Sequence, residues 1–233
     1  MTRNTIEHDL RRIDDILLRL CELADEAMLG ATQALAEADV TTAQRVIDGD
    51  RETSALHREL DNLVMYVMAR RSPVATDLRR LLAALRVGAD AERMNGLSRH
   101  VAKVARRRYP RCVAPGSSRD AVLSMGEVAA HGAALTRELL ATRDVRLVGQ
   151  IIAVDDEMDR LHRTLLAYLI GPDWEHGVEP AVDLTLVARF YERYGDHTVT
   201  IAHQVHFIVT GEYREPRPRV VIVPPRKQFL MPR

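Results

Sequence analysis

The feature that most constrains the fold of this chain is an internal repeat of about a hundred residues. A shift of 105 positions places Leu56-His57-Arg58 on Leu161-His162-Arg163. Further along the chain the shift becomes 100 positions, and Glu92-Arg93 then falls on Glu192-Arg193. A repeat of this length predicts two tandem copies of one structural unit.

Within each copy, aliphatic residues recur at spacings of three and four, which is typical of amphipathic helices. The pattern predicts six long helices, over residues 5–38, 42–70, 73–108, 120–142, 145–169 and 180–209. We expect Thr41 or Thr42 to cap the second helix, and Ser72 to cap a third helix that begins at Pro73. The chain is therefore predicted to be all-α, with each copy forming an antiparallel three-helix bundle.

The predicted boundary between the copies is a linker over residues 109–119, where two prolines, a glycine and two serines interrupt the helical pattern. The expected organisation is a first three-helix unit over 5–108, this linker, a second three-helix unit over 120–211, and a tail over 212–233. The tail is rich in proline and contains the apolar run Val220–Val223. We expect it to be mostly irregular.

The charge balance argues against nucleic-acid binding, because 33 basic residues are matched by 33 acidic ones. The arginine cluster at Arg106, Arg107, Arg108 and Arg111 is assigned instead to the end of a helix, where cations complement the helix dipole.

Three further features lead us to expect a cytoplasmic location. It begins with a segment charged throughout, unlike a signal peptide, and it has no run of ~18 apolar residues that would span a membrane. Cys21 and Cys112 lie in no metal-ligand spacing, so we expect thiols in a reducing compartment.

Two pairs of carboxylates stand out on the predicted helices of the second copy. Asp155 and Asp159 lie one turn apart on its middle helix, and Glu192 and Asp196 lie one turn apart on its last helix. Like charges at this spacing repel by a few tenths of a kcal/mol unless a cation lies between them. Because antiparallel neighbouring helices would bring the pairs together, the four carboxylates predict a bound cation. An all-oxygen ligand set suits Mg²⁺, Mn²⁺, Ca²⁺ or iron, and the sequence leaves the choice open.

The first copy keeps only half of this arrangement. It retains Asp50 and Glu92, whereas Ser54 and Gly96 replace the second carboxylate of each pair. His162 could add a nitrogen ligand in the second copy, although a histidine also recurs at the matching position of the first copy, which favours a structural role. The competing interpretation of every such pair is a solvated acidic face. We predict one metal site in the second copy and none in the first.

Three motifs add to the two repeats: Asp155-x-x-x-Asp159-x-Leu161, Pro73–Arg79 (PVATDLR) and Glu192–His197 (ERYGDH). Together these features, over residues 5–212, resemble the PhoU family. The Ala- and Arg-rich composition and Arg106–Pro110 are similar to the actinobacterial branch. Some members of the family bind multinuclear metal clusters through E(D)-x-x-x-D motifs. The resemblance therefore implies metal ligands at Asp155, Asp159, Glu192 and Asp196, and more weakly at Asp50 and Glu92.

The resemblance also implies a function. PhoU-family proteins are cytoplasmic regulators of phosphate uptake and of the phosphate-starvation response. The implied partners are the ATPase of the Pst phosphate transporter and a PhoR-type sensor histidine kinase, and a homodimer is implied as well. The expected role is a non-enzymatic adaptor and negative regulator.

The alternative function is a metal-dependent hydrolase or a metal-storage helical bundle. Di-iron bundles generally place Glu-x-x-His on two helices. Here Asn95 follows Glu92 by three residues, and Gly195 follows Glu192 by three. The sequence also has no P-loop and no paired nucleophile and base. These observations favour the adaptor over the enzyme.

Overall fold

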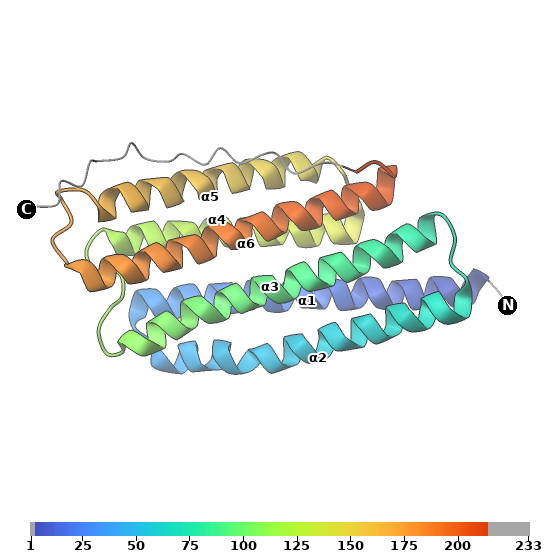
Figure 1. Cartoon of the computed structure of the whole chain (residues 1–233), viewed down its shortest axis with the longest axis horizontal. Helices are drawn as coiled ribbons and strands as arrows, with labels where there is room; N and C mark the ends of the chain where they lie inside the picture. The colour runs from blue at the N-terminus through green and yellow to red at the C-terminus, as the bar shows by residue number, and fades with distance from the viewer. Residues whose placement is uncertain (1–2, 214–233) are drawn as a thin grey trace, which may run out of the picture.

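Residues 3–213 are described by the computed structural model, and they form six helices (Figure 1). The helices are α1 (Arg3–Glu37), α2 (Val40–Arg71), α3 (Thr76–Arg108), α4 (Ser118–Thr142), α5 (Leu147–Leu169) and α6 (Val178–Thr210). The prediction for the tail, including Val220–Val223, lies outside the described residues except at positions 212 and 213. None of the described helices carries an apolar stretch long enough to cross a membrane.

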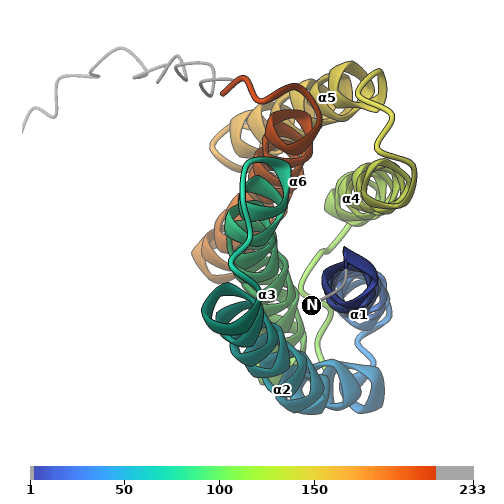
Figure 2. The ribbon, with the colours of Figure 1, turned by 90° about the vertical axis from the view of Figure 1, so that its right-hand side faces the viewer.

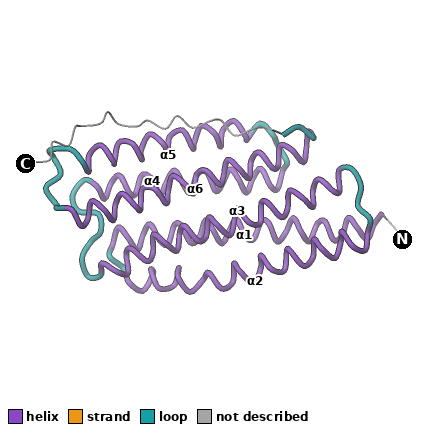
Figure 3. The backbone as a smooth tube through the Cα atoms, in the orientation of Figure 1, coloured by secondary structure: helices purple, strands orange, loops and turns teal. Residues whose placement is uncertain are grey.

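The helices form two antiparallel three-helix bundles, which lie side by side along their length (Figure 3). We call α1–α3 the first unit and α4–α6 the second unit. The units meet where α3 packs on α6 and α1 packs on α4. Seen end-on, α2, α3, α6 and α5 follow one another in a row, with α1 and α4 on the same side of it (Figure 2). The predicted all-α architecture of two tandem bundles is confirmed.

One continuous apolar core runs through both units. Along α1, apolar residues recur every three or four positions and face this core. Among them are Leu10, Leu20 and Met28, each at most 1% exposed. Tyr191 and Tyr194 of α6 are fully buried. Burying apolar surface yields roughly 25 cal/mol per Å², so this shared core strongly favours the assembled pair of bundles.

The seam between α1 and α4 depends on a close approach at Gly126. A Cβ on Gly126 would lie 2.5 Å from Cγ2 of Thr32. Thr32 and Tyr191 share a buried hydrogen bond of 2.5 Å between their hydroxyl oxygens, which joins α1 to α6. The lack of a side chain at Gly126 therefore allows α1 and α4 to approach closely at this point.

The predicted cap of α2 was wrong by two or three residues. Asp39, not Thr41 or Thr42, occupies the cap position: its Oδ1 accepts the backbone N–H groups of Thr41 (2.9 Å) and Thr42 (3.1 Å). The Thr42 hydroxyl donates to Oδ2 of Asp39 at 2.7 Å. These hydrogen bonds, with that of the Thr42 side chain the strongest, lower the pKa of Asp39. A carboxylate at this position satisfies amide groups that the helix itself leaves unpaired.

The predicted start of α3 was also wrong. Ser72 ends α2 in the left-handed conformation (φ 47°), and α3 begins only at Thr76. A Ser-Pro pair fits either role, because proline also follows the end of a helix. Here Arg70 and Arg71 in the last turn of α2 complement its dipole and accompany the termination.

The arginine cluster at the end of α3 joins the two units. Asp183 of α6 is 2% exposed and accepts from Nη2 of Arg107 (2.5 Å) and from Nε of Arg108. Nη1 of Arg108 also lies 2.6 Å from a carboxylate oxygen of Glu179. Arg107 and Arg108 thus pair with carboxylates at the start of α6, in addition to their predicted place at a helix end.

Candidate functional site

The predicted metal ligands lie where α5 packs on α6. Asp155 and Asp159 of α5 and Asp196 of α6 are half-buried, and Glu192 of α6 is 5% exposed. Asp155 reaches the backbone of α6 at Gly195, where a Cβ would lie only 2.6 Å from its Oδ1. The structure therefore places the carboxylate of Asp155 against α6 at Gly195, which lies between Glu192 and Asp196 in the sequence.

His162 lies on α5, close to Asp159 and Glu192. Burial lowers its pKa most strongly, whereas the nearby carboxylates of Glu192 and Asp159 act to raise it. Glu192 also accepts a hydrogen bond from Nη1 of Arg189, one turn earlier on α6. His162, Asp159 and Glu192 are thus close enough to interact electrostatically, and a neutral imidazole is the form that binds metals.

In the first unit, the equivalent carboxylates of Asp50 and Glu92 are paired with other side chains of the same unit. Nδ2 of Asn95 donates to Oδ1 of Asp50 (3.3 Å), and Nη1 of Arg99 donates to Oδ2 of Asp50. On the other side of the site, the Ser54 hydroxyl donates to Oε1 of Glu92 at 3.1 Å. His57 Nδ1 lies 2.9 Å from Oε2 of Glu92. Both remaining carboxylates of the first unit therefore have protein partners.

Within residues 3–213, no three side chains of the His, Cys, Asp and Glu types are arranged so that they could hold a metal ion. The donor chemistry of the second unit nevertheless fits a hard cation, because four carboxylates can supply the oxygen ligands that such ions prefer. The bare backbone of Gly195 also leaves room for the Asp155 carboxylate. The second unit therefore has the residue types that a hard cation prefers, although its described side chains are not arranged around a metal ion.

One polar contact near this site was missed by the sequence reasoning. Nδ1 of His197, at the end of the ERYGDH segment, lies 3.0 Å from Oδ1 of Asp90 on α3. Asp90 is 5% exposed and also accepts from Nη1 of Arg93 at 3.2 Å. The contact connects the candidate site's helix to the first unit. A signal was present, since an acidic residue lies among the apolar positions of α3.

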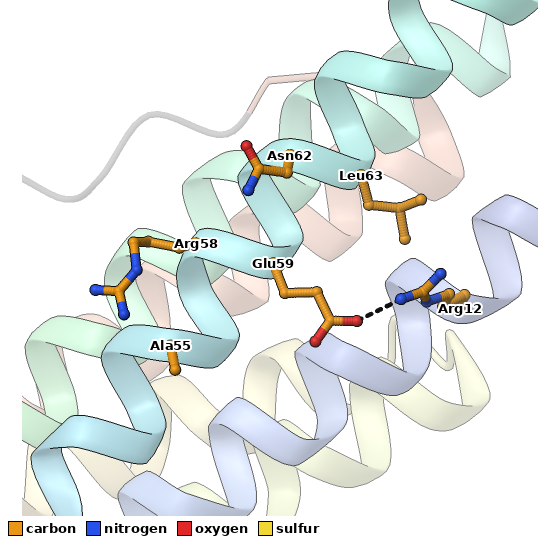
Figure 4. Close-up of a pocket in the computed structure, with 6 residues that line it drawn as sticks. All are labelled: Arg12, Ala55, Arg58, Glu59, Asn62 and Leu63. Carbon is orange, nitrogen blue, oxygen red and sulfur yellow. Dashed lines mark hydrogen bonds and ion pairs between the residues drawn. The ribbon is translucent and has the colours of Figure 1, made fainter.

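A shallow hollow in the first unit, between α1 and α2, is not part of this site (Figure 4). Glu59 reaches toward Arg12, and Nη2 of Arg12 lies 2.6 Å from its carboxylate, whereas Arg58 points away from both (Figure 4). The guanidinium of Arg12 is therefore neutralised by a carboxylate. This hollow contains none of the predicted metal ligands.

A family model described as the PhoU domain matches the chain twice, over residues 17–105 and 122–205. The two matches fall on the two units. Together they cover more than half of the chain.

Curated relatives match over almost the full length. The "Phosphate-specific transport system accessory protein PhoU homolog 2" of Mycobacterium tuberculosis is 38% identical over 211 residues, which are 91% of this chain and 99% of that protein. The "PhoU homolog 1" of Mycobacterium leprae is 38% identical over 213 residues, which are 91% of this chain and 96% of that protein.

Solved structures agree in fold. PhoU from Pseudomonas aeruginosa superimposes with a TM-score of 0.81 at 25% identity, covering 88% of this chain and 99% of that one. The phosphate transport system regulatory protein PhoU from Streptococcus pneumoniae gives a TM-score of 0.82 at 20% identity, covering 91% and 100%. The internal repeat, the paired bundles and the nearly full-length coverage of these matches show that the chain belongs to the PhoU family.

Proposed function

We propose that this protein is a non-enzymatic accessory regulator of phosphate uptake. In this role it restrains a PhoR-type sensor kinase, and the Pst transporter, when phosphate is plentiful. It acts in the cytoplasm, as a homodimer, and contacts the transporter's ATPase. The observation that carries the proposal is the full-length similarity to proteins named as phosphate-specific transport system accessory proteins. Long exposed helices also offer extended surfaces for a partner's helix or groove.

The second unit is proposed to bind a divalent or iron-type metal ion through Asp155, Asp159, Glu192 and Asp196, with His162 as an additional donor. The ion would supply positive charge among four carboxylates, of which Glu192 also accepts a hydrogen bond from Arg189. Asp155 and Asp159 come from α5, and Glu192 and Asp196 from α6. Binding would therefore hold these two helices together. The supporting observations are the ligand chemistry and the contact of Asp155 with Gly195.

Deleting the gene tests the regulatory role. In high phosphate, the deletion strain should express a phosphate-starvation reporter that the parent strain represses. A plasmid carrying the intact gene should restore repression. Unchanged reporter expression in the deletion strain, with any second gene of the same family also removed, would contradict the proposal.

The partner assignment is tested separately. Purified protein should bind the transporter's ATPase subunit and the cytoplasmic part of the kinase in a direct binding assay. Failure to bind either purified partner, under conditions where the deletion strain shows its phenotype, would mean that the regulation runs through another protein.

A further inference from the structure

The exposed side of the seam between α3 and α6 carries basic side chains from both helices. These two helices lie next to each other in the middle of the row in Figure 2, and α1 and α4 cover only the opposite side of that row. Exposed basic residues project from α3 at Arg93, Lys103 and Arg107, and from α6 at Arg189 and Arg193. We call these five residues the basic face.

The basic face is continuous along both helices. At 100° per residue, its three α3 residues fall within about 80° of one another around the helix, and its two α6 residues lie one turn apart. No acidic residue interrupts α3 between positions 93 and 108. On α6, Glu192 is the one acidic residue between positions 184 and 195. The positive charges therefore gather on one side of the molecule.

Three members of the basic face have carboxylate partners, but these partners are buried beneath them. The ion pairs are Arg93 with Asp90, Arg107 with Asp183, and Arg189 with Glu192. The carboxylate side chains are at most 7% exposed, whereas the arginine side chains are 52–64% exposed. A molecule that approaches this surface therefore meets the positive member of each pair.

The other two members, Lys103 and Arg193, lie beside an aromatic pair at the centre of the face. Among residues 3–213, neither forms an ion pair. Both are close enough to His100 for their charges to lower its pKa, an effect to which burial contributes most. His100 is exposed and stacks on the partly buried Phe190, with 5.2 Å between ring centroids. Two cations and an aromatic surface thus lie together.

The charge of the rest of the molecule favours a short acidic partner over a large polyanion. Residues 3–213 contain 27 basic and 32 acidic side chains, so the basic face stands out from a surface of the opposite sign. A membrane or a nucleic acid extends beyond the face and would meet that negative surface as well. A short segment meets only the face, because exposed charges more than about 10 Å away are largely screened.

From these observations we propose that the basic face docks an acidic helix of a protein partner. The stretch from Arg93 to Arg107 is about 21 Å long, which corresponds to about four helical turns of the partner. Carboxylates of the partner pair with Lys103 and Arg193, and an apolar side chain packs on His100 and Phe190. The inference gives the proposed regulator a contact surface, and it rests on that proposed function only for the identity of the partner.

The test measures binding of a fluorescent helical peptide of about four turns by fluorescence anisotropy. The peptide carries glutamates along one face and a leucine at its centre, and a matched peptide has glutamine in place of each glutamate. The full-length protein should bind the glutamate peptide at least tenfold more tightly than the glutamine peptide at about 50 mM salt, and the preference should shrink as salt is raised. Equal binding of the two peptides would overturn the proposal.

A pair of double variants locates the binding surface. Lys103→Glu with Arg193→Glu should weaken binding of the glutamate peptide at least tenfold. Arg51→Glu with Arg163→Glu makes the same change in charge at exposed positions outside the basic face, and it should weaken binding less than twofold. Circular dichroism checks that both variants are helical. Equal weakening by the two variants would contradict the assignment.

Vesicles of phosphatidylglycerol test the competing occupant. If the protein binds these vesicles through Lys103 and Arg193 but shows no preference for the glutamate peptide, the face is a membrane-binding surface and the proposal fails.

The phosphate-starvation reporter separates this inference from the proposed function. A strain that carries the Lys103→Glu, Arg193→Glu variant should lose repression in high phosphate, as the deletion strain does, while the Arg51→Glu, Arg163→Glu strain keeps it. Full repression by the first variant, in a background where the deletion loses repression, would show that the regulator does not use the basic face. If the deletion itself changes nothing, the proposed function fails, and the peptide measurement alone decides whether the face binds an acidic helix.

Discussion

The carboxylate of Asp155 lies directly against the backbone of Gly195, on the helix that carries Glu192 and Asp196. A Cβ at position 195 would be 2.6 Å from Oδ1 of Asp155, closer than van der Waals contact allows. We predict that Gly195→Ala displaces the Asp155 carboxylate without removing any of the proposed metal ligands. Metal content measured by elemental analysis should fall several-fold relative to the wild-type protein.

Gly149→Ala is the matched control for this prediction. Gly149 is an exposed glycine within α5, and a Cβ there would have no neighbouring atom within 4 Å. This variant should keep its metal, and it should gain up to about 1 kcal/mol of stability from the better helix propensity of alanine. Equal metal content in Gly195→Ala and Gly149→Ala would show that the Asp155 contact does not shape the site.

The seam between the units should be sensitive to one methyl group at Gly126. In Gly126→Ala the new Cβ would lie 2.5 Å from Cγ2 of Thr32, whose hydroxyl bonds to Tyr191. Overpacking at a buried contact of this kind costs about 1–3 kcal/mol. Chemical denaturation should therefore show a lower free energy of unfolding. Gly49→Ala, where a Cβ has no neighbour within 4 Å, should not be destabilised.

The pairing of Asp183 with Arg107 and Arg108 predicts that removing Asp183 costs more stability than removing Arg107. Asp183 is 2% exposed, and its removal in Asp183→Ala leaves two guanidinium groups without this partner. We expect a loss of about 1–3 kcal/mol in the free energy of unfolding. Arg107→Ala should cost less, because Arg107 is largely exposed and Arg108 still holds the carboxylate. Equal losses would mean that Asp183 is not the centre of this contact.

His100 should make the protein sensitive to acid. Its ring stacks on Phe190 across the seam between α3 and α6, with 5.2 Å between centroids. Burial, and then the charges of Lys103, Arg99 and Arg193, lower its pKa below the usual 6.5. The unfolded chain therefore takes up a proton on His100 more readily than the folded chain does, so stability present above about pH 6.5 is lost as the pH falls.

The measurement for His100 is a comparison of melting temperatures at about pH 7.5 and about pH 5.5, on either side of the ordinary histidine pKa. The drop on acidification should be smaller in His100→Gln than in the wild-type protein. A nuclear magnetic resonance titration that places the pKa of His100 at or above 6.5 would contradict the argument.

The sequence predicted the helices well because their stripes are long and regular, but local capping was ambiguous. The Ser72-Pro73 pair fits the start of a helix as well as the end of one, and only the tertiary fold decides between them. Asp39 was overlooked as a cap because Thr41 and Thr42 are also good cap residues.

The residues of the candidate site were predicted only in part, because sequence spacing does not determine side-chain contacts. The repeat identified Asp155 and Glu192 as equivalents of Asp50 and Glu92, since that comparison needs only sequence spacing. It did not reveal that Arg99 bonds to Asp50, or that His197 reaches Asp90 on another helix. Such contacts depend on the rotation of each helix and on the rotamers of long side chains, which periodicity alone does not determine.

The central claim is that the second unit binds metal through the carboxylates of α5 and α6. The most direct measurement is elemental analysis of the purified wild-type protein beside the Asp159→Ala, Asp196→Ala double variant, with circular dichroism to confirm that both are helical. We predict bound metal in the wild-type protein and at least a tenfold lower content in the variant. Equal metal content in the two proteins would contradict the claim.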